Sequence, residues 1–323
     1  MSEVFFFEAF DEEKKALRRY RPQNIRAHFT PKTIQEANLK KIPAEIISIR
    51  TQSVIPKAWN RSLKAVFTRS TGYNHILTAR RGSGLSVPCG CLADYCSRSV
   101  AEQAVLLVMA LLRKLNLQQK HFVNFNRDGL TGMDIHNRNI LIVGVGHIGR
   151  QVVDIARGLK ANVKGVDVKQ NVKDLNYVSL PEGIRWADVI VCAALLNKKT
   201  DGMLGYASLR QARRGCVLVN VSRGEITPLR DLEKLLKEKI LGGLGMDVFP
   251  DEAKVAEALR DKKKTAKDLI DGIRRLKKID NVIFTPHNAF NTQESVERKA
   301  RGTIEGIQVF LKDGKFPCPV PEA

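Results

Sequence analysis

The sequence feature that most restricts the fold is the stretch ILIVGVGHIGRQV at residues 140–152. An apolar segment typical of a buried strand leads into Gly144, Gly146 and Gly149, and a helical pattern follows at once. The next β-rich segment, NVKGVDV, carries Asp167 near its end, eighteen residues past Gly149. Glycines in this pattern between a strand and a helix, followed by an acid at this distance, are typical of a βαβ unit that binds a dinucleotide.

This pattern predicts NAD as the cofactor. The glycines let the backbone approach a pyrophosphate, whose negative charge the N–H groups and the dipole of the helix N-terminus stabilise. We expect Asp167 to accept hydrogen bonds from the ribose hydroxyls and to repel the 2′-phosphate of NADP. Lys169 lies nearby, so the sequence does not decide how strict the preference for NAD is.

Strand-like and helix-like segments alternate along the chain, which is typical of α/β domains with parallel sheets. The N-terminal part predicts strands at 3–10, 24–29, 44–50 and 63–70, with helices at 11–20 and 33–41. Ser99 followed by Glu102 resembles a capping box, and the apolar run behind it predicts one long helix over 97–120. The alternation then restarts and ends in a helix from about 292 to 311.

Composition narrows the class of protein. A length of 323 residues predicts about two domains, and a hydrophobic content of 43% with 27% charged residues is that of a globular protein. The chain has no run of 18 apolar residues, and its N-terminus, MSEVFFFEAFDEE, does not resemble a signal peptide, so we expect no membrane association and a cytoplasmic location.

The net charge of +20 raises the question of nucleic acid. The basic residues are spread along the chain, mostly beside acidic ones, and the densest stretch, 254–280, has the apolar spacing of amphipathic helix. We therefore expect a solvated helical face and no specific nucleic-acid binding. The reason for the strongly basic charge stays open.

The six cysteines do not predict a disulfide framework, because they are few and scattered for a chain of 323 residues. Cys89, Cys91 and Cys96 lie close together, but the paired C-x-x-C spacing and the nearby histidine that favour a closed zinc site are missing. We predict free thiols and no metal site.

His287 follows a β-rich segment and a proline in NVIFTPHNAF. A lone histidine in such a place is more often a surface or core residue than a catalytic one. However, Arg223 in VNVSRGEI and Glu252 in GMDVFPDE also follow predicted strands, and ligands bind at the carboxyl ends of strands in doubly wound sheets. Arginine can clamp a carboxylate, histidine can give a proton to a developing alkoxide, and a carboxylate behind the histidine orients its ring. These three residues predict hydride transfer to a 2-keto acid.

The motifs VGVGHIG, NVSRGEI, GMDVFPDE and TPHNAF, in this order, resemble those of the D-2-hydroxyacid dehydrogenase family over essentially the whole chain. The resemblance implies an NAD-dependent oxidoreductase in which Arg223 binds the substrate, His287 is the acid/base and Glu252 is its partner. Asp247 matches the aspartate near the nicotinamide. The resemblance also implies a set of cofactor-binding residues: Gly144, Gly146, His147, Ile148, Gly149, Asp167, Val221 and Asp247.

The same resemblance implies an α/β fold of two doubly wound parallel-sheet domains with a cleft between them. A flavodoxin-like substrate domain is expected at 1–98 and 291–323, and a Rossmann-type NAD-binding domain at 99–290. A homodimer is expected to form through the long helix after residue 98.

In the N-terminal half, RSTGYNHI resembles the substrate loop, in which the backbone N–H groups of Thr71 and Gly72 hold the substrate carboxylate. ADYCSRSVAEQ resembles the loop that brings Tyr95 over the substrate in the D-lactate dehydrogenase branch, and Phe290 is expected to be an apolar wall. These residues favour D-lactate dehydrogenase-like reduction of a small 2-keto acid.

Three departures from the family pattern concern the cofactor contacts and the substrate, and none of them involves Arg223, Glu252 or His287. Cys192–Leu196 replaces a motif with histidine and proline, Pro228 replaces a common aspartate, and VPCGCLADYC is longer than usual. Reduction of glyoxylate or hydroxypyruvate and the phosphoglycerate reaction are alternatives within the family. A less favoured alternative of another class is an NAD-sensing scaffold of the corepressor type.

Overall fold

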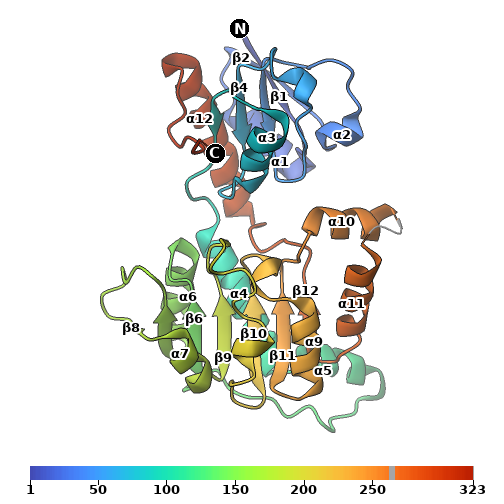
Figure 1. The fold of residues 1–323 in the computed structure, drawn as a ribbon, viewed down its shortest axis with the longest axis vertical. Helices are drawn as coiled ribbons and strands as arrows, with labels where there is room; N and C mark the ends of the chain where they lie inside the picture. Colours follow the sequence, from blue (N-terminus) through green and yellow to red (C-terminus); the bar gives the residue numbers. More distant parts are fainter. Residues whose placement is uncertain (262–265, 323) are drawn as a thin grey trace. The chain divides into compact units, whose positions relative to one another are not determined.

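A computed structural model describes residues 1–261 and 266–322 of the chain (Figure 1). The chain divides into two compact units. Unit 1 comprises Met1–Cys96 and Asn291–Ala323, and unit 2 comprises Ser97–Phe290. Because unit 2 is inserted into unit 1, residues from the two ends of the chain build one core.

Unit 1 consists of a parallel sheet and the helices around it. Its elements are β1 (Ser2–Phe6), α1 (Asp11–Tyr20), β2 (Ile25–Phe29), α2 (Ile34–Ala37), β3 (Ile46–Ile49), a 3-10 turn (Lys57–Trp59), β4 (Ala65–Thr68), α3 (Asn74–Ser83), β5 (Cys89–Gly90) and α12 (Gln293–Asp313). The strand order is β2-β1-β3-β4-β5, with every named pair parallel.

Helices cover both faces of the sheet in unit 1, and its central strands are the most buried. β3 and β4 are buried at every position. On one face, α1 packs against α12, and Gly306 of α12 lies so close to the Phe67 ring that a Cβ at this position would be 2.6 Å from it. On the other face, Ile47 and Val66 pack with Trp59 and Ile76.

Unit 2 contains the longer sheet. Its helices are α4 (Ser97–Leu112), α5 (Leu115–His121), α6 (His147–Gly158), α7 (Leu180–Trp186), α8 (Tyr206–Leu209), α9 (Leu229–Lys237), α10 (Glu252–Asp261) and α11 (Lys267–Lys277), with 3-10 turns at Phe122–Asn124 and Gly224–Ile226. Its strands are β6 (Asn139–Val143), β7 (Asn162–Val166), β8 (Asn176–Tyr177), β9 (Val189–Cys192), β10 (Cys216–Asn220), β11 (Leu241–Met246) and β12 (Val282–Phe284).

The strand order of unit 2 is β12-β11-β10-β9-β6-β7-β8. From β6 the chain adds β7 and β8 on one side of the sheet, and it then adds β9 to β12 on the other side, so the order of addition reverses between β6 and β9. The residues of β6 alternate between the two faces. The side chain of Leu141 packs against Gly183 of α7, whereas that of Ile142 packs against Gly149 of α6. The reversal makes the carboxyl end of β6 the topological switch point, where ligands bind in sheets of this kind. The predicted α/β class with two parallel sheets is confirmed.

The predicted single helix over 97–120 is wrong in two respects. α4 begins at Ser97, so Ser99 is a buried residue inside the helix and not its N-cap, and Glu102 pairs with Arg98 at 2.6 Å. The helix also ends at Leu112, because Lys114 adopts a left-handed conformation with φ of 50°, and α5 starts after it. A left-handed residue interrupts the α-helical hydrogen-bond ladder, and apolar periodicity does not reveal it.

Two further helical predictions are modified. The helix predicted at 33–41 ends at Ala37, because Asn38 is left-handed. The charged stretch 254–280 contains most of α10 and the whole of α11, while its residues 262–265 lie outside the described part of the chain. Within the described ranges, 1–261 and 266–322, no helix is long and apolar enough to cross a lipid bilayer.

Candidate active site

The glycine-rich turn lies between β6 and α6, at the switch point of the sheet. Gly144 has a φ of 93°, which favours glycine, and its N–H donates to the Val166 carbonyl at 2.8 Å. A Cβ on Gly144 would overlap the backbone of Ala194, and one on Gly149 would overlap the Gly144 carbonyl. Gly146 differs, since a Cβ there would meet no atom within 4 Å. The turn is therefore tight on its inner side and open at Gly146.

Asp167 follows the neighbouring strand β7, and its carboxylate faces the glycine turn. One carboxylate oxygen accepts the Val145 N–H at 2.6 Å, and the other accepts the Lys169 N–H at 2.8 Å. A carboxylate can accept about four hydrogen bonds, so two further acceptor positions remain. His147 and Ile148 form the exposed and half-exposed start of α6.

The departure at Cys192–Leu196 lies beside this turn. Ala193 donates its N–H to the Val143 carbonyl at 2.8 Å, which places Ala194 against Gly144. Val221 follows β10 and donates to the Cys192 carbonyl at 3.2 Å, and the Ser222 hydroxyl donates to the Ala194 carbonyl. These contacts connect the loops that follow β6, β9 and β10, even though the histidine–proline motif is absent.

His287 and Glu252 form the shortest polar contact between the predicted catalytic side chains. Nδ1 of His287 lies 2.6 Å from Oε1 of Glu252, and each side chain is 31% exposed. Glu252 is the first residue of α10, where the helix dipole favours a negative charge. The Phe290 ring centre lies 6.3 Å from that of His287, at a near-perpendicular angle of 76°. A histidine held in this way can donate or accept a proton at its other nitrogen.

Asp247 organises the backbone around His287. It is fully buried after β11, and its carboxylate accepts hydrogen bonds from the N–H groups of Asn288 and Ala289, both at 2.9 Å, and from the Thr285 hydroxyl at 2.5 Å. Its backbone carbonyl accepts the His287 N–H at 2.8 Å. Asp247 therefore holds the loop that presents the imidazole.

Arg223 lies half-exposed in the loop after β10. The Asn220 side chain shapes this loop by donating to the Arg223 carbonyl and to the Thr227 hydroxyl, both at 2.8 Å. Gly224 then brings the loop against the segment before Glu252, since a Cβ on Gly224 would overlap the backbone of Phe249 and Pro250. The guanidinium donates to the Ser222 carbonyl at 2.7 Å, which leaves most of its five N–H donors for a ligand.

In unit 1, Thr71 is exposed and Gly72 is half-exposed in the loop after β4. A chain of hydrogen bonds shapes this loop: Thr68 Oγ1 lies 2.8 Å from Nε2 of His75 and 2.9 Å from Oγ of Ser70, and Ser70 donates to the Gly72 carbonyl at 2.7 Å. Neither His75 nor Thr68 belongs to a sequence motif with its own chemistry, so their place in this loop could not be predicted.

Tyr95 is only 7% exposed, and burial raises the pKa of its hydroxyl above the usual range. The Lys299 ammonium lies 5.9 Å from the centre of its ring. Lys299 in turn belongs to a buried ionic cluster, defined here as Glu13, Arg69 and Lys299. Oε1 of Glu13 lies 2.9 Å from Arg69 Nε and 3.1 Å from Lys299 Nζ.

The charges of this cluster shift the pKa values of Glu13 and Lys299. Burial by itself would raise the pKa of Glu13, but the positive charges of Arg69, Lys299 and Arg50 outweigh it and hold that pKa at about 2. Burial lowers the pKa of Lys299 to about 8, although the Glu13 carboxylate acts in the opposite direction. No sequence motif predicts this cluster, because its members are far apart in the chain.

Comparison with known proteins decides the family. Residues 105–289 match the NAD binding domain of the D-isomer specific 2-hydroxyacid dehydrogenases. The chain belongs to this family. The dehydrogenase is 32% identical to a 2-hydroxyacid dehydrogenase homolog of Zymomonas mobilis over 76% of its own length and 75% of that protein.

Two further proteins are similar to the dehydrogenase over most of its length. The D-lactate dehydrogenase of Escherichia coli is 29% identical over 83% of this chain and 82% of that one. The structure of the Aquifex aeolicus D-lactate dehydrogenase, complexed with NAD and lactic acid, matches with a TM-score of 0.80 and 25% identity over 97% of this chain and 98% of that one.

The residues of the dehydrogenase fit its cofactor, NAD. Gly146 leaves open space above the helix N-terminus, as a pyrophosphate requires, and Asp167 keeps acceptor positions for ribose hydroxyls. Among residues 1–261 and 266–322, no group of three or more His, Cys, Asp or Glu side chains is arranged to hold a metal ion.

Proposed function

We propose that the dehydrogenase reduces a small 2-keto acid to a D-2-hydroxy acid, as a D-lactate dehydrogenase does, with Arg223, Glu252 and His287 as its catalytic residues. The observation that carries the proposal is the 2.6 Å contact between His287 Nδ1 and Glu252 Oε1, beside the loop of Arg223. NADH supplies the hydride when it is bound. The protein residues bind and orient the substrate and move a proton.

His287 gives the proton that reduction requires. With Nδ1 donating to Glu252, the proton on Nε2 is the one that passes to the substrate oxygen as its negative charge develops. The Glu252 carboxylate stabilises the protonated ring and fixes its orientation. In the reverse direction the neutral ring accepts the proton of the hydroxyl group.

Arg223 binds the carboxylate of the substrate and polarises the carbonyl that is reduced. A guanidinium suits this role, because its planar fork matches a carboxylate with two parallel hydrogen bonds. Thr71 and Gly72, through their backbone N–H groups, and Tyr95 remain our predictions for further substrate contacts. Phe290, beside His287, is our prediction for an apolar wall.

The identity of the keto acid follows from a panel of substrates with NADH. Similarity to the Escherichia coli D-lactate dehydrogenase supports pyruvate, and the panel adds phenylpyruvate, branched 2-keto acids, glyoxylate, hydroxypyruvate and phosphohydroxypyruvate. We expect the highest kcat/KM with a small unphosphorylated 2-keto acid. A preference for phosphohydroxypyruvate, glyoxylate or hydroxypyruvate would favour the alternatives within the family.

Replacing His287 or Arg223 by alanine tests the assigned roles. We expect each variant to bind NADH as the wild type does, measured by fluorescence titration, while turnover falls by about 10²- to 10⁴-fold. His28→Ala is the control, because this exposed histidine lies in β2 of unit 1. Turnover above about a tenth of wild type in either variant would contradict the roles, since general acid catalysis contributes more than this.

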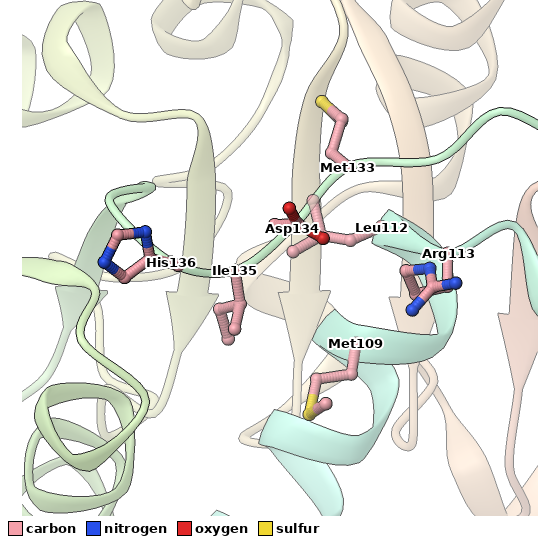
Figure 2. A pocket seen from close by; sticks show the side chains of 7 residues that line it. All are labelled: Met109, Leu112, Arg113, Met133, Asp134, Ile135 and His136. Carbon is pink, nitrogen blue, oxygen red and sulfur yellow. The ribbon is translucent and has the colours of Figure 1, made fainter.

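We further propose a homodimer that forms through α4 and the segment after it. Large apolar side chains are exposed there: Leu106 (57%), Met109 (41%), Leu115 (42%), Phe122 (73%), Val123 (84%) and Phe125 (70%). An adjacent hollow of about 240 Å³ is lined by residues of α4 and of the segment from Met133 to His136. Figure 2 shows Met109 and Arg113 on one side and the side chains of that segment on the other. Exposed apolar surface of this kind is typical of protein–protein interfaces.

A further inference from the structure

The C-terminal segment of the chain forms a β-bridge with the edge strand of unit 1. Gly90 of β5 pairs with Pro319 in antiparallel orientation. Two backbone hydrogen bonds flank the bridge, from the Cys91 N–H to the Cys318 carbonyl at 2.9 Å and from the Val320 N–H to the Cys89 carbonyl at 2.8 Å. In this register Cys91 and Cys318 occupy opposite positions, and their Sγ atoms lie 3.2 Å apart.

The backbone at this bridge is compatible with a disulfide. Opposite residues of an antiparallel pair have Cα atoms about 4.5–5.5 Å apart. Disulfide-bonded cysteines have Cα atoms about 4.4–6.8 Å apart and an S–S bond of about 2.05 Å. The two sulfur atoms therefore need to approach by only about 1.2 Å, which small side-chain rotations can provide.

Packing holds the two cysteines together without a covalent bond. Phe316 stacks on Phe310 of α12 with ring centres 4.5 Å apart, and it lies 5.4 Å from Phe67 of β4. Gly90 makes room for this ring, because a Cβ there would overlap it. The Arg80 guanidinium donates to the carbonyls of Val320 at 3.2 Å and of Pro321.

We propose that Cys91 and Cys318 form a redox-sensitive thiol pair, which a peroxide oxidises to a disulfide that fastens the C-terminal segment to β5. The pair is distinct from the residues assigned to hydride transfer. Neither partner is needed for the proposed dehydrogenase chemistry.

The two thiols have different roles in this reaction. Cys318 is half-exposed, whereas Cys91 is 5% exposed and burial raises the pKa of its thiol to about 12, so Cys318 reacts first. The Cys318 sulfur attacks a peroxide oxygen, the O–O bond breaks, and the departing hydroxide leaves as water with the thiol proton. The Cys91 sulfur then attacks the sulfenic sulfur, the S–O bond breaks, and a second water leaves. Two electrons pass from the thiols to the peroxide.

The disulfide would close a long loop. Cys91 and Cys318 are separated by 227 positions, and the whole of unit 2 lies between them. A crosslink of this span reduces the conformational freedom of the unfolded chain more than one that closes a short loop. We therefore expect the oxidised protein to unfold at a higher temperature than the reduced protein.

The test is to treat the full chain with a small excess of hydrogen peroxide and to count thiols after denaturation. We expect the number to fall from six to four, the intact mass to decrease by two hydrogen atoms, and dithiothreitol to reverse both changes. Tandem mass spectrometry of the tryptic digest should join the peptide FPCPVPEA to Cys91, and not to Cys89 or Cys96 of the same partner peptide.

Serine variants provide the controls. Cys318→Ser should keep all five remaining thiols under the same treatment, and Cys91→Ser should lose only the Cys318 thiol, as a sulfenic acid without a crosslink, whereas Cys89→Ser and Cys96→Ser should each lose two. Circular dichroism verifies that each variant folds, and Cys318→Ser is the safer variant because its side chain is only half-buried. The proposal is overturned by a crosslink to Cys89 or Cys96, by thiol loss that persists in Cys318→Ser, by an unchanged thiol count, or by a gain of two oxygen atoms without a crosslink.

Discussion

At the scale of single residues, His287 combines a side-chain contact with an unusual backbone conformation. Its φ of 49° lies in the left-handed region, which costs a non-glycine residue about 1–3 kcal/mol. The hydrogen bonds from the loop to Asp247 hold this conformation. Asp247 therefore positions the imidazole, a role that goes beyond the expected place near the nicotinamide.

Replacing Glu252 by glutamine should slow keto-acid reduction more than oxidation of the hydroxy acid. The substitution keeps the shape of the side chain but removes the negative charge beside His287, the proton donor in reduction. We expect kcat/KM of keto-acid reduction near pH 7 to fall, whereas kcat/KM of oxidation falls less, because oxidation needs the neutral ring. The measurement is kcat/KM in both directions, with Glu257→Gln on the same helix as the control. Values equal to those of wild type in both directions would contradict the assignment.

Asp167 should determine the choice of cofactor. Asp167→Ala removes acceptors for the ribose hydroxyls together with a charge that repels a 2′-phosphate. We expect the ratio of kcat/KM with NADH to that with NADPH to decrease. The control is Asp174→Ala, a substitution in the loop that follows β7. An unchanged ratio in Asp167→Ala would contradict the prediction.

At the scale of elements, the buried cluster of Glu13, Arg69 and Lys299 joins α1, the loop after β4 and α12. Glu13→Gln leaves two buried cations without their counter-charge, so we expect a loss of about 3–5 kcal/mol in the free energy of unfolding. Urea titration measures this loss. Glu12→Gln, exposed one residue earlier on the same helix, should change stability by less than about 0.5 kcal/mol.

The same cluster predicts a pH dependence with a defined sign. The pKa of Glu13 is about 2 in the folded chain and 4.5 is its ordinary value, so the folded state binds fewer protons between these limits. The stabilisation is complete above pH 4.5 and is lost as the pH falls toward 2. The stability difference between wild type and Glu13→Gln should therefore shrink over this range. A constant difference would mean that the Glu13 charge does not stabilise the fold.

At the scale of the whole molecule, the exposed apolar side chains of α4 provide the test of the proposed dimer. Leu106→Glu and Met109→Glu place charges on this surface, and we expect them to convert the dimer to monomer in light scattering coupled to gel filtration. Leu259→Glu is the matched control, because Leu259 is an equally exposed leucine (55%) on α10. A monomeric wild type, or dimeric charge variants, would refute the proposed interface.

The sequence alone was sufficient for features that depend on neighbouring residues. The helix predicted at 11–20 is α1, with identical bounds, and the glycine turn lies between β6 and α6 as its pattern indicates. Residue spacing carries such information because strands, turns and helix starts depend on contacts a few positions apart. The same reasoning failed where one left-handed residue, Lys114, interrupts an apolar periodicity that continues beyond it.

Only the tertiary structure decided which distant residues meet. It places His287 Nδ1 and Glu252 Oε1 2.6 Å apart, assigns Asp247 to the support of the His287 loop, and assembles Glu13, Arg69 and Lys299 from both ends of the chain. It also brings Cys318 to Cys91 across 227 positions, where the sequence predicted only scattered free thiols. Contacts of this kind depend on how sheets and helices pack, and no local pattern of residues encodes them.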